Sequence, residues 1–210
     1  MTAVIVLAKS PSPGRVKTRL CPPYTPAQAA VVATAALEDT LAAVAASTAE
    51  RRVLALDGEL GAWLPTGWRV VRQRGEGLTA RLEAAFRAVG PPALLIGMDT
   101  PQITPNDITE ALAALGDPSC DAVLGPTLDG GYWAIGFRRP VRGAFRGVTM
   151  SVATTGAEQL QRLARQHLRV RLLPLMRDVD YYSDALAVAD AAPASRFAHA
   201  VRAAEVVSAQ

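Results

Sequence analysis

A loop near the N-terminus gathers the first side chains that could do chemistry. Four cations, Lys9, Arg15, Lys17 and Arg19, stand around Gly14 directly after a short apolar run. Two prolines stiffen this loop, because proline fixes φ and removes a backbone donor. Closely spaced cations in a stiff loop are typical of a phosphate-binding site. The residues alone also allow a plainer interpretation, a solvated basic loop on the surface.

The loop does not match the sequence of a P-loop. That motif, G-x-x-x-x-G-K-[ST], places a glycine directly before the lysine so that the backbone can wrap the phosphates. Here Val16 precedes Lys17, and Gly14 lies three residues before it. A P-loop NTPase is therefore excluded, and phosphates would be held by side chains rather than by the backbone.

Aspartates follow apolar runs at several later points of the chain. Asp99 comes directly after the run 93–98, and Asp129 lies near the end of the next one. Asp178 and Asp180 stand one residue apart and would point the same way in an extended segment. Ligands of open α/β sheets bind beyond the carboxyl ends of the strands. Carboxylates gathered there would suit Mg²⁺ (or Mn²⁺), although any one of them could instead be a turn residue.

A glycine pattern favours a different cofactor. The segment that begins at Gly75 and Gly77 satisfies G-x-G-x-x-[G/A], and Asp99 follows about 20 residues later, as a dinucleotide fingerprint requires. Three polar residues, 72–74, separate this segment from the preceding apolar run, and the first strand carries another loop. Dinucleotide binding therefore stays a minor alternative.

Nucleophilic catalysis has no visible candidate. Neither His167 nor His199 stands in a pattern with an acid or a nucleophile, and no Ser-His-Asp arrangement is legible. Cys21 and Cys120 show no zinc-ligand spacing, which suggests reduced thiols in a cytoplasmic protein.

The elements that must position these residues alternate along the chain. Strands are expected at 3–7, 51–57, 68–71, 93–98, 121–124, 132–137 and 170–173. Helices are expected at 26–46, 78–89, 105–115, 155–167 and 193–206, with a short one capped by Ser183. The alternation predicts an α/β layer fold with a mostly parallel sheet. The strand 132–137 should return antiparallel, since its connection is too short for a crossover.

Composition limits the possible partners. The 210 residues, 50% hydrophobic and 20% charged, are enough for one full core, so a single domain spanning 1–210 is expected. The net charge of +3 comes without a long Lys/Arg tract, which argues against nucleic acid. No targeting segment is visible, and no stretch approaches the ~20 apolar residues of a membrane span. A cytoplasmic protein with small anionic ligands is expected.

Four segments occur in the order seen in one group of GT-A fold proteins. They are Ala8-Lys-Ser-Pro-Ser-Pro-Gly-Arg-Val-Lys-Thr-Arg-Leu20, Gly97-Met-Asp-Thr-Pro101, Gly125-Pro-Thr-Leu-Asp-Gly-Gly-Tyr132 and Arg177-Asp-Val-Asp180. Through them the chain resembles the radical-SAM/selenodomain-associated transferases of the nucleotide-diphospho-sugar transferase superfamily. The match covers about residues 3 to 186. It implies an α/β three-layer sandwich around a mostly parallel, mixed sheet with one antiparallel strand.

A more distant resemblance assigns roles to residues. The Lys-Thr-Arg-Leu segment and the aspartates are similar to those of the guanylyltransferases that activate phosphoenolpyruvate or phospholactate. The resemblance implies phosphate contacts at Lys9, Lys17 and Arg19, in a nucleotide-binding loop with Gly14 and Arg15, and metal ligands at Asp99, Asp178 and Asp180. It also implies that Gly75, Gly77, Leu78 and Arg81 approach the base or ribose. The chain departs from sugar nucleotidylyltransferases in lacking their Gly-x-Gly-x-Arg loop, and it lacks an Asp-x-Asp after the fourth strand.

These assignments lead to three functional hypotheses. The first is Mg²⁺-dependent transfer of a nucleotidyl group from an NTP to a small anionic acceptor, with Lys17 and Arg19 stabilising the departing pyrophosphate. The second is a glycosyltransferase with an NDP-sugar donor, in which Asp129 acts beside an acceptor site formed by Gly130, Gly131 and Tyr132. The third is a nucleotide-binding protein without turnover.

Overall fold

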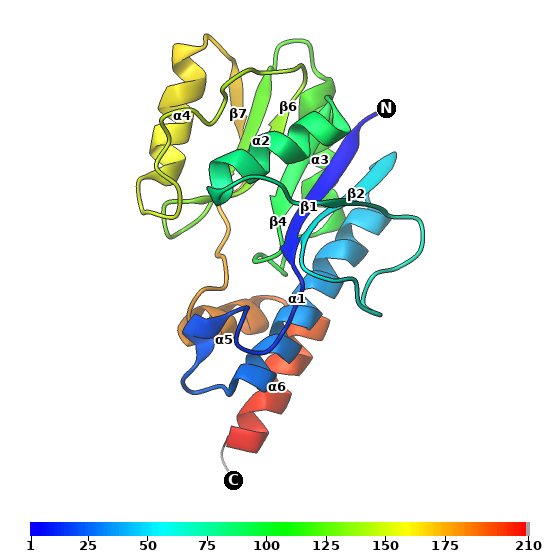
Figure 1. Cartoon of the computed structure of the whole chain (residues 1–210), viewed down its shortest axis with the longest axis vertical. Coiled ribbons are helices and arrows are strands. Elements are labelled where there is room, and N and C mark those ends of the chain that lie inside the picture. The colour runs from blue at the N-terminus through cyan, green and yellow to red at the C-terminus, as the bar shows by residue number, and fades with distance from the viewer. Residues whose placement is uncertain (209–210) are drawn as a thin grey trace.

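The computed structural model describes residues 1–208 of the chain, and within them a seven-stranded sheet runs through the molecule (Figure 1). Its spatial order is β3-β2-β1-β4-β6-β5-β7. The strands are β1 (Ala3–Lys9), β2 (Arg51–Asp57), β3 (Arg69–Arg72), β4 (Ala93–Gly97), β5 (Ala122–Pro126), β6 (Tyr132–Phe137) and β7 (Val170–Leu172). The helices are η1 (Thr18–Leu20), α1 (Pro26–Ala46), α2 (Gly77–Val89), α3 (Pro105–Gly116), α4 (Thr155–Arg165), α5 (Tyr182–Ala191) and α6 (Arg196–Ser208).

The sheet is parallel except at one strand. β1 pairs in parallel with β2 and β4, β2 with β3, and β5 with β7. β6 runs antiparallel to both of its neighbours, β4 and β5. The expected mixed sheet with one antiparallel strand is confirmed, and so is its cause, because only a five-residue turn separates β5 from β6.

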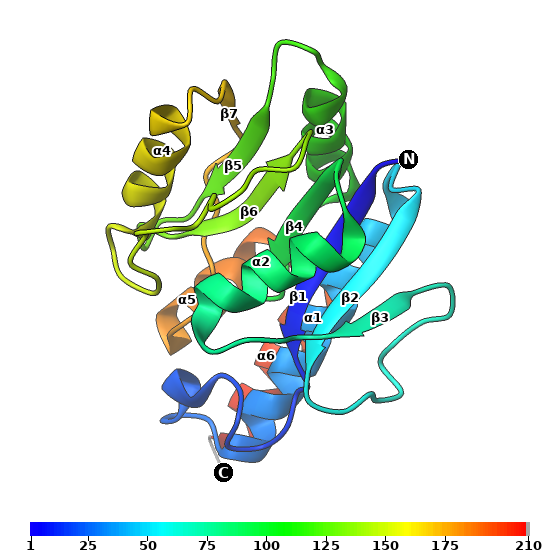
Figure 2. The ribbon, with the colours of Figure 1, turned by 45° about the horizontal axis from the view of Figure 1, so that its top comes forward.

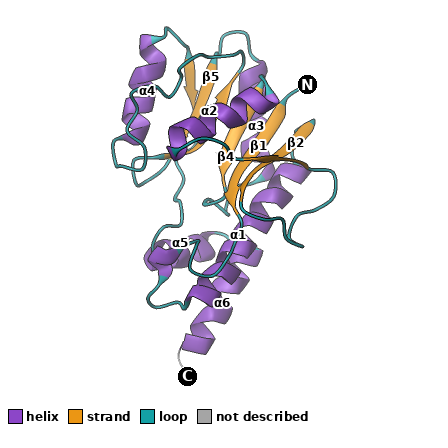
Figure 3. Ribbon diagram, in the orientation of Figure 1, coloured by secondary structure: helices purple, strands orange, loops and turns teal. Residues whose placement is uncertain are grey.

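Helices cover both faces of the sheet, which gives three layers (Figure 3). Side chains alternate along a strand, so Val4 and Val6 of β1 face one layer and Ala3 and Ile5 face the other. The first face is covered by α1 and α3, and the second by α2 and α4. The all-apolar strands of the sequence are therefore explained by burial on two sides.

A third apolar cluster joins η1, α1, α5 and α6. Figure 1 shows α5 and α6 at the bottom of the view, beyond the end of the sheet. Leu37 of α1 packs toward the sheet, while Val32 and Ala36 pack toward α6. By length and composition α1 could cross a membrane, and in this respect the expectation that no such stretch exists was wrong. In the fold, 61% of its apolar window is buried inside the protein.

Helix ends follow local capping chemistry. Capping boxes form at Thr25 with Gln28 and at Thr104 with Asp107. Two expected starts were wrong. The short helix α5 is capped at Tyr181 rather than at Ser183, and α6 begins at Arg196 rather than at 193, after the Ser195 hydroxyl that accepts from the Ala198 N–H.

The end of α4 also differs from its expected position. The helix was expected to reach His167 and ends at Arg165. His167 adopts a left-handed φ of 58°, which the right-handed helix cannot include.

Candidate active site

The carboxyl ends of the parallel strands meet at one edge of the sheet (Figure 2). Most of the predicted site residues follow these strand ends. β1 ends there at Lys9, β4 just before Asp99, and β5 shortly before Asp129. The segment after β7 returns to the same edge, because Leu128 N–H donates to the Met176 carbonyl at 3.0 Å. Sheet topology therefore brings together loops that are far apart in the sequence.

Lys17 is the buried centre of the contact between these loops. Its side chain is 7% exposed, and its ammonium lies 2.5 Å from the Asp99 carboxylate. The same ammonium donates to the Val179 carbonyl. The Val179 N–H in turn donates to the Asp99 carbonyl at 2.8 Å. Lys17 and the two backbone groups thus fix the segment that carries Asp178 and Asp180 against the end of β4.

Arg19 forms a second, more exposed ion pair across the same contact. Its guanidinium lies 2.5 Å from the Asp180 carboxylate and 5.6 Å from the centre of the Tyr181 ring. The arginine side chain is 60% exposed. This pair can therefore exchange with solvent or with a ligand more easily than the pair of Lys17 with Asp99.

A tight turn holds Asp129. One carboxylate oxygen accepts from the Thr127 hydroxyl at 2.5 Å and from the Gly131 N–H at 2.9 Å. Gly130 has a φ of +88°, and a Cβ there would stand 1.9 Å from the Ala153 carbonyl oxygen. Glycine at position 130 is therefore required both by the backbone angle of the turn and by its close approach to the start of α4. The other carboxylate oxygen of Asp129 has no partner among the described residues.

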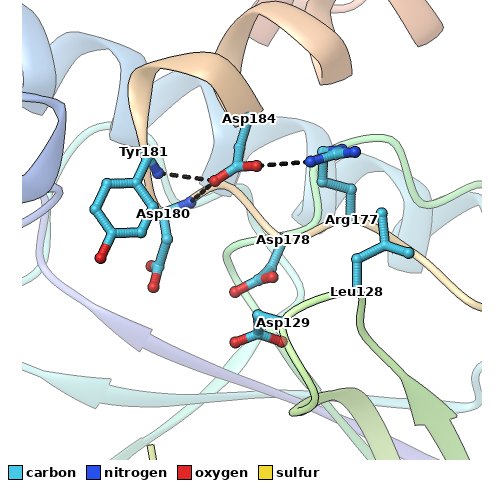
Figure 4. A pocket seen from close by; sticks show the side chains of 7 residues that line it. All are labelled: Leu128, Asp129, Arg177, Asp178, Asp180, Tyr181 and Asp184. Carbon is cyan, nitrogen blue, oxygen red and sulfur yellow. Dashed lines mark hydrogen bonds and ion pairs between the residues drawn. The ribbon is translucent and has the colours of Figure 1, made fainter. Parts of the chain in front are cut away.

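Asp129 and Asp178 lie side by side in a pocket of about 210 Å³ (Figure 4). Burial raises the pKa of Asp178 to about 6, and repulsion from the Asp129 and Asp180 carboxylates adds to this effect. Among the described residues, neither Asp129 nor Asp178 is in an ion pair. The pocket is thus a site of uncompensated negative charge beside a basic loop.

Asp184, to which the sequence pattern assigned no role, supports this pocket. The Asp184 carboxylate accepts from the Tyr181 N–H at 2.9 Å and from the Arg177 guanidinium at 2.9 Å. It therefore fixes both ends of the segment 177–181, which carries two of the aspartates. A local signal exists, because Asp184 stands at the third helical position of a capping box, but Ser183 is the stronger cap by residue type.

The pocket carboxylates have the chemistry of ligands for a divalent cation. Oxygen donors of this type fit Mg²⁺ or Mn²⁺, and Mg²⁺ commonly takes one or two protein carboxylates together with substrate phosphates. The unpaired Asp129 and Asp178 match that pattern, and Asp178 would lose its unfavourable repulsion if a cation lay between them. Within residues 1–208, no three acidic, histidine or cysteine side chains are grouped as a complete protein cage would require.

The Gly75–Arg81 segment lies at the same edge, beyond β2 and β3. Arg81 pairs with Asp57 at the end of β2 at 2.9 Å, and Gly75 and Gly77 both have positive φ. The sheet order places β2 and β1 between β3 and β4. Asp99 is therefore not on the strand next to the glycine segment, and the dinucleotide pattern loses the neighbouring acid that it needs.

Other predicted site residues are less closely placed. Lys9 and Arg15 are exposed, and no ion pair involves them in the described part of the chain. Leu78 is 37% exposed at the start of α2. The Tyr132 side chain packs on the face covered by α2 and α4, with its hydroxyl 3.8 Å from the Met150 sulfur. Burial there raises the pKa of Tyr132, and its ring is not among the residues that line the acidic pocket.

Comparisons with known proteins agree with this architecture. The profile of a family described as "Uncharacterized protein conserved in bacteria (DUF2064)" matches residues 30–152, more than half of the chain. No curated protein matches the chain in sequence.

Solved structures extend the comparison over the whole fold. The chain is similar to a proposed nucleotide-diphospho-sugar transferase from Desulfovibrio desulfuricans G20, with a TM-score of 0.88 and 26% identity over 100% of this chain and 97% of that one. It also shares its fold with CMP:2-keto-3-deoxy-manno-octonic acid synthetase complexed with CTP, at a TM-score of 0.59 and 13% identity over 91% and 98% of the chains. A Mycobacterium tuberculosis H37Rv protein in a complex with manganese gives a TM-score of 0.53 and 24% identity over 90% and 97%. The fold is that of the nucleotide-diphospho-sugar transferases.

Proposed function

The chain belongs to the bacterial family DUF2064, and we propose that this member is a metal-dependent nucleotidylyltransferase. It would transfer a nucleotidyl group from an NTP to a small anionic acceptor and release pyrophosphate. Among the similar solved structures, one is a proposed nucleotide-diphospho-sugar transferase and another is a CMP:2-keto-3-deoxy-manno-octonic acid synthetase complexed with CTP, which supports a transferase as the broader class.

The main support for the proposal is the distribution of charge at the carboxyl edge of the sheet. The carboxylates of Asp129 and Asp178 are uncompensated, and the cationic loop with Arg19 reaches the same edge of the sheet through its pair with Asp180. An anionic phosphate chain and a divalent cation would together satisfy both charge sets. Neither ligand alone would do so. Phosphate by itself would be repelled by the carboxylates, and a cation by itself would leave the cationic side chains of the basic loop without an anionic partner.

Different residues of the site would bind the metal ion and the phosphates. Asp129 and Asp178 would hold Mg²⁺, with Asp180 lining the same pocket and Asp99 paired to Lys17 beside it, and the bound ion would neutralise charge on the phosphates. Lys9, Arg15 and Arg19 are free enough to contact phosphate oxygens. Lys17 is engaged by Asp99 and Val179, so its contact with phosphate would be gained at the expense of those partners. Phosphoryl-type chemistry needs no covalent nucleophile from the chain.

A second candidate, transfer of a sugar from an NDP-sugar, has an observation in its favour. The similar protein of 26% identity that spans the whole chain is itself a proposed nucleotide-diphospho-sugar transferase. In this alternative the same carboxylates and cations would hold the diphosphate, and Asp129 with the turn Gly130–Gly131 would face the acceptor.

A turnover assay separates these candidates. We would incubate the protein with Mg²⁺, each NTP in turn and a panel of small phosphorylated and carboxylated acceptors, and measure pyrophosphate release. The proposal predicts acceptor-dependent release that EDTA abolishes and that Asp129→Asn or Asp178→Asn lowers by at least about a hundredfold.

The matched control is Asp190→Asn, which removes an exposed aspartate of α5 and should keep the wild-type rate. Release of NDP from an NDP-sugar without pyrophosphate release would favour the glycosyltransferase. Binding of nucleotide with no release of either kind would favour the protein without turnover.

A further inference from the structure

A second and larger cavity opens at the opposite edge of the sheet. It measures about 540 Å³ and lies between the end of α2, the start of β4 and the loop that follows β6. The sheet separates it from the acidic pocket, because Gly90 and Pro91 precede β4 and Phe137 ends the antiparallel β6. We infer that this cavity binds a small amphipathic organic anion, with an apolar body on its aromatic floor and an anionic head on its arginine rim.

Three phenylalanines build the floor. Phe86 stacks on Phe145 with ring centres 6.0 Å apart and meets Phe137 edge-on at 5.0 Å. Phe137 and Phe145 are almost fully buried and support the half-buried Phe86, which offers ring surface to the cavity. Rings held in this way present apolar area at little entropic cost, because packing has already fixed their rotamers.

Three arginines form the rim. Arg87, Arg139 and Arg142 line the cavity and are exposed, and among the described residues none of their side chains has an ion pair. Glu83 is the one acidic residue of the lining, so the rim has a positive excess. Guanidinium groups bind carboxylates and similar oxyanions through paired N–H donors, which gives the head group its chemistry.

The wall opposite α2 is preformed. Side chains of α4 and of Gln166 directly after it hold the loop after β6 by its backbone. Gln159 donates to the Ala144 carbonyl, Arg162 to the Gly143 carbonyl and Gln166 to the Arg142 carbonyl, each at 2.9 Å. The loop therefore needs no reorganisation to keep the cavity open. The volume also lies in the usual range of small-molecule sites, about 300–1,000 Å³.

The ligand class follows from the combination of floor and rim. An apolar neutral molecule would leave the arginines unused, and a polyphosphate would gain nothing from the three rings. A molecule with one apolar body and one oxyanion head satisfies both. The cavity is also concave and small, which suits a metabolite-sized ligand rather than a macromolecule.

Fluorescence titration with 8-anilinonaphthalene-1-sulfonate, an amphipathic aromatic anion, tests this inference on the full chain. We expect saturable binding of one molecule per chain. The variant Arg139→Gln/Arg142→Gln should weaken it by about tenfold or more, because two charge-assisted contacts are lost. The control Arg69→Gln/Arg165→Gln removes the same charge from exposed positions outside the cavity and should bind as the wild type does.

A neutral analogue completes the test. N-phenyl-1-naphthylamine carries the same rings without the sulfonate and should bind at least about tenfold more weakly to the wild type. Unfolding midpoints of both double variants, measured by circular dichroism, should stay near that of the wild type, so that lost binding reports the rim. The inference is overturned if the anion does not saturate a single site, or if the rim variant and the control bind it equally.

Discussion

Asp178 is the residue at which charge and burial conflict most strongly. Burial and the nearby Asp129 and Asp180 carboxylates raise its pKa to about 6, above the 3.8 of a free aspartate. The folded state therefore holds this proton more tightly than the unfolded chain does. The protonated Asp178 therefore contributes to the free energy of unfolding in full below about pH 4, and this contribution is lost as the pH rises through 6. At neutral pH, the ionised Asp178 destabilises the metal-free fold.

The first prediction uses this linkage. In EDTA, Asp178→Asn should be more stable than the wild type at pH 7.5 and gain nothing at pH 4, because the variant lacks the carboxylate that repels its neighbours. Thermal unfolding midpoints across pH 4 to 8 give the comparison, with Asp190→Asn as the control that keeps the wild-type profile. If the unfolding midpoint of Asp178→Asn changed with pH in parallel with that of the wild type, the neighbouring carboxylates would not destabilise the ionised Asp178.

Lys17 and Arg19 give the second prediction, because both make ion pairs across the same contact but differ in burial. Lys17→Met leaves the Asp99 carboxylate and the Val179 carbonyl without their shared donor, which should cost about 1–3 kcal/mol of unfolding free energy. Arg19→Met opens an exposed pair and should cost about 0–1 kcal/mol. Urea unfolding measures both. Equal costs would mean that the Lys17 contact does not hold the two loops together.

Some of the site residues could be predicted from the sequence, and others could not. A basic loop, strand-end aspartates and an Asp-Gly-Gly turn were visible as candidates, since each has a local signal. The pairing of Lys17 with Asp99 and with Val179 has none, because it depends on how β1, β4 and the segment after β7 meet at one edge. The role of Asp184 was hidden by a neighbouring serine that is also a good cap.

At the scale of elements, the turn between β5 and β6 positions Asp129. Gly130 satisfies two constraints at once, a left-handed φ and a contact that would place a Cβ at 1.9 Å from the Ala153 carbonyl oxygen. Gly14 in the basic loop has a similar φ of +74° but open space around it. A substitution at Gly14 would therefore cost backbone strain alone, whereas a substitution at Gly130 would cost backbone strain and a steric clash.

The third prediction compares these glycines. Gly14→Ala should cost roughly 1–2 kcal/mol, the strain of a left-handed residue with a Cβ. Gly130→Ala should cost at least twice as much and should also abolish pyrophosphate release, because the turn must move and Asp129 moves with it. Calorimetric unfolding and the turnover assay provide the two readouts. Similar midpoints for the two variants would contradict the tight packing of the turn on α4.

Most elements were predictable because their signals are local. Strand β6 and helix α1 have the expected bounds, and the apolar runs that become β1 and β4 were recognised as buried. The exceptions are helix boundaries, such as the end of α4 and the start of α6, where a single backbone angle or hydroxyl group determines the position. The cavity beside α2 had no sequence signal, since its floor and rim come from separate elements and from a loop without a motif.

At the scale of the whole molecule, the sheet has a pocket at each of two opposite edges. The carboxyl edge carries the acidic pocket and the basic loop, and the opposite edge carries the aromatic cavity. Helix α2 connects them, with Arg81 near its start paired to Asp57 and Phe86 near its end on the cavity floor. Figure 2 shows this helix lying across the face of the sheet.

We expect the carboxyl edge of the sheet to bind a nucleotide together with a divalent cation. Thermal unfolding of the wild type, Asp129→Asn/Asp178→Asn and Asp190→Asn, with NTPs, NDP-sugars or NADH in Mg²⁺ or in EDTA, tests it most directly. At a nucleotide concentration of 100 times Kd, Mg²⁺ with NTP should add about 2.7 kcal/mol, or roughly 5–10 °C, to the wild type and to Asp190→Asn. EDTA or the double variant should remove that gain. Stabilisation by NTP that is equal in Mg²⁺ and EDTA, or equal in the double variant, would contradict the claim.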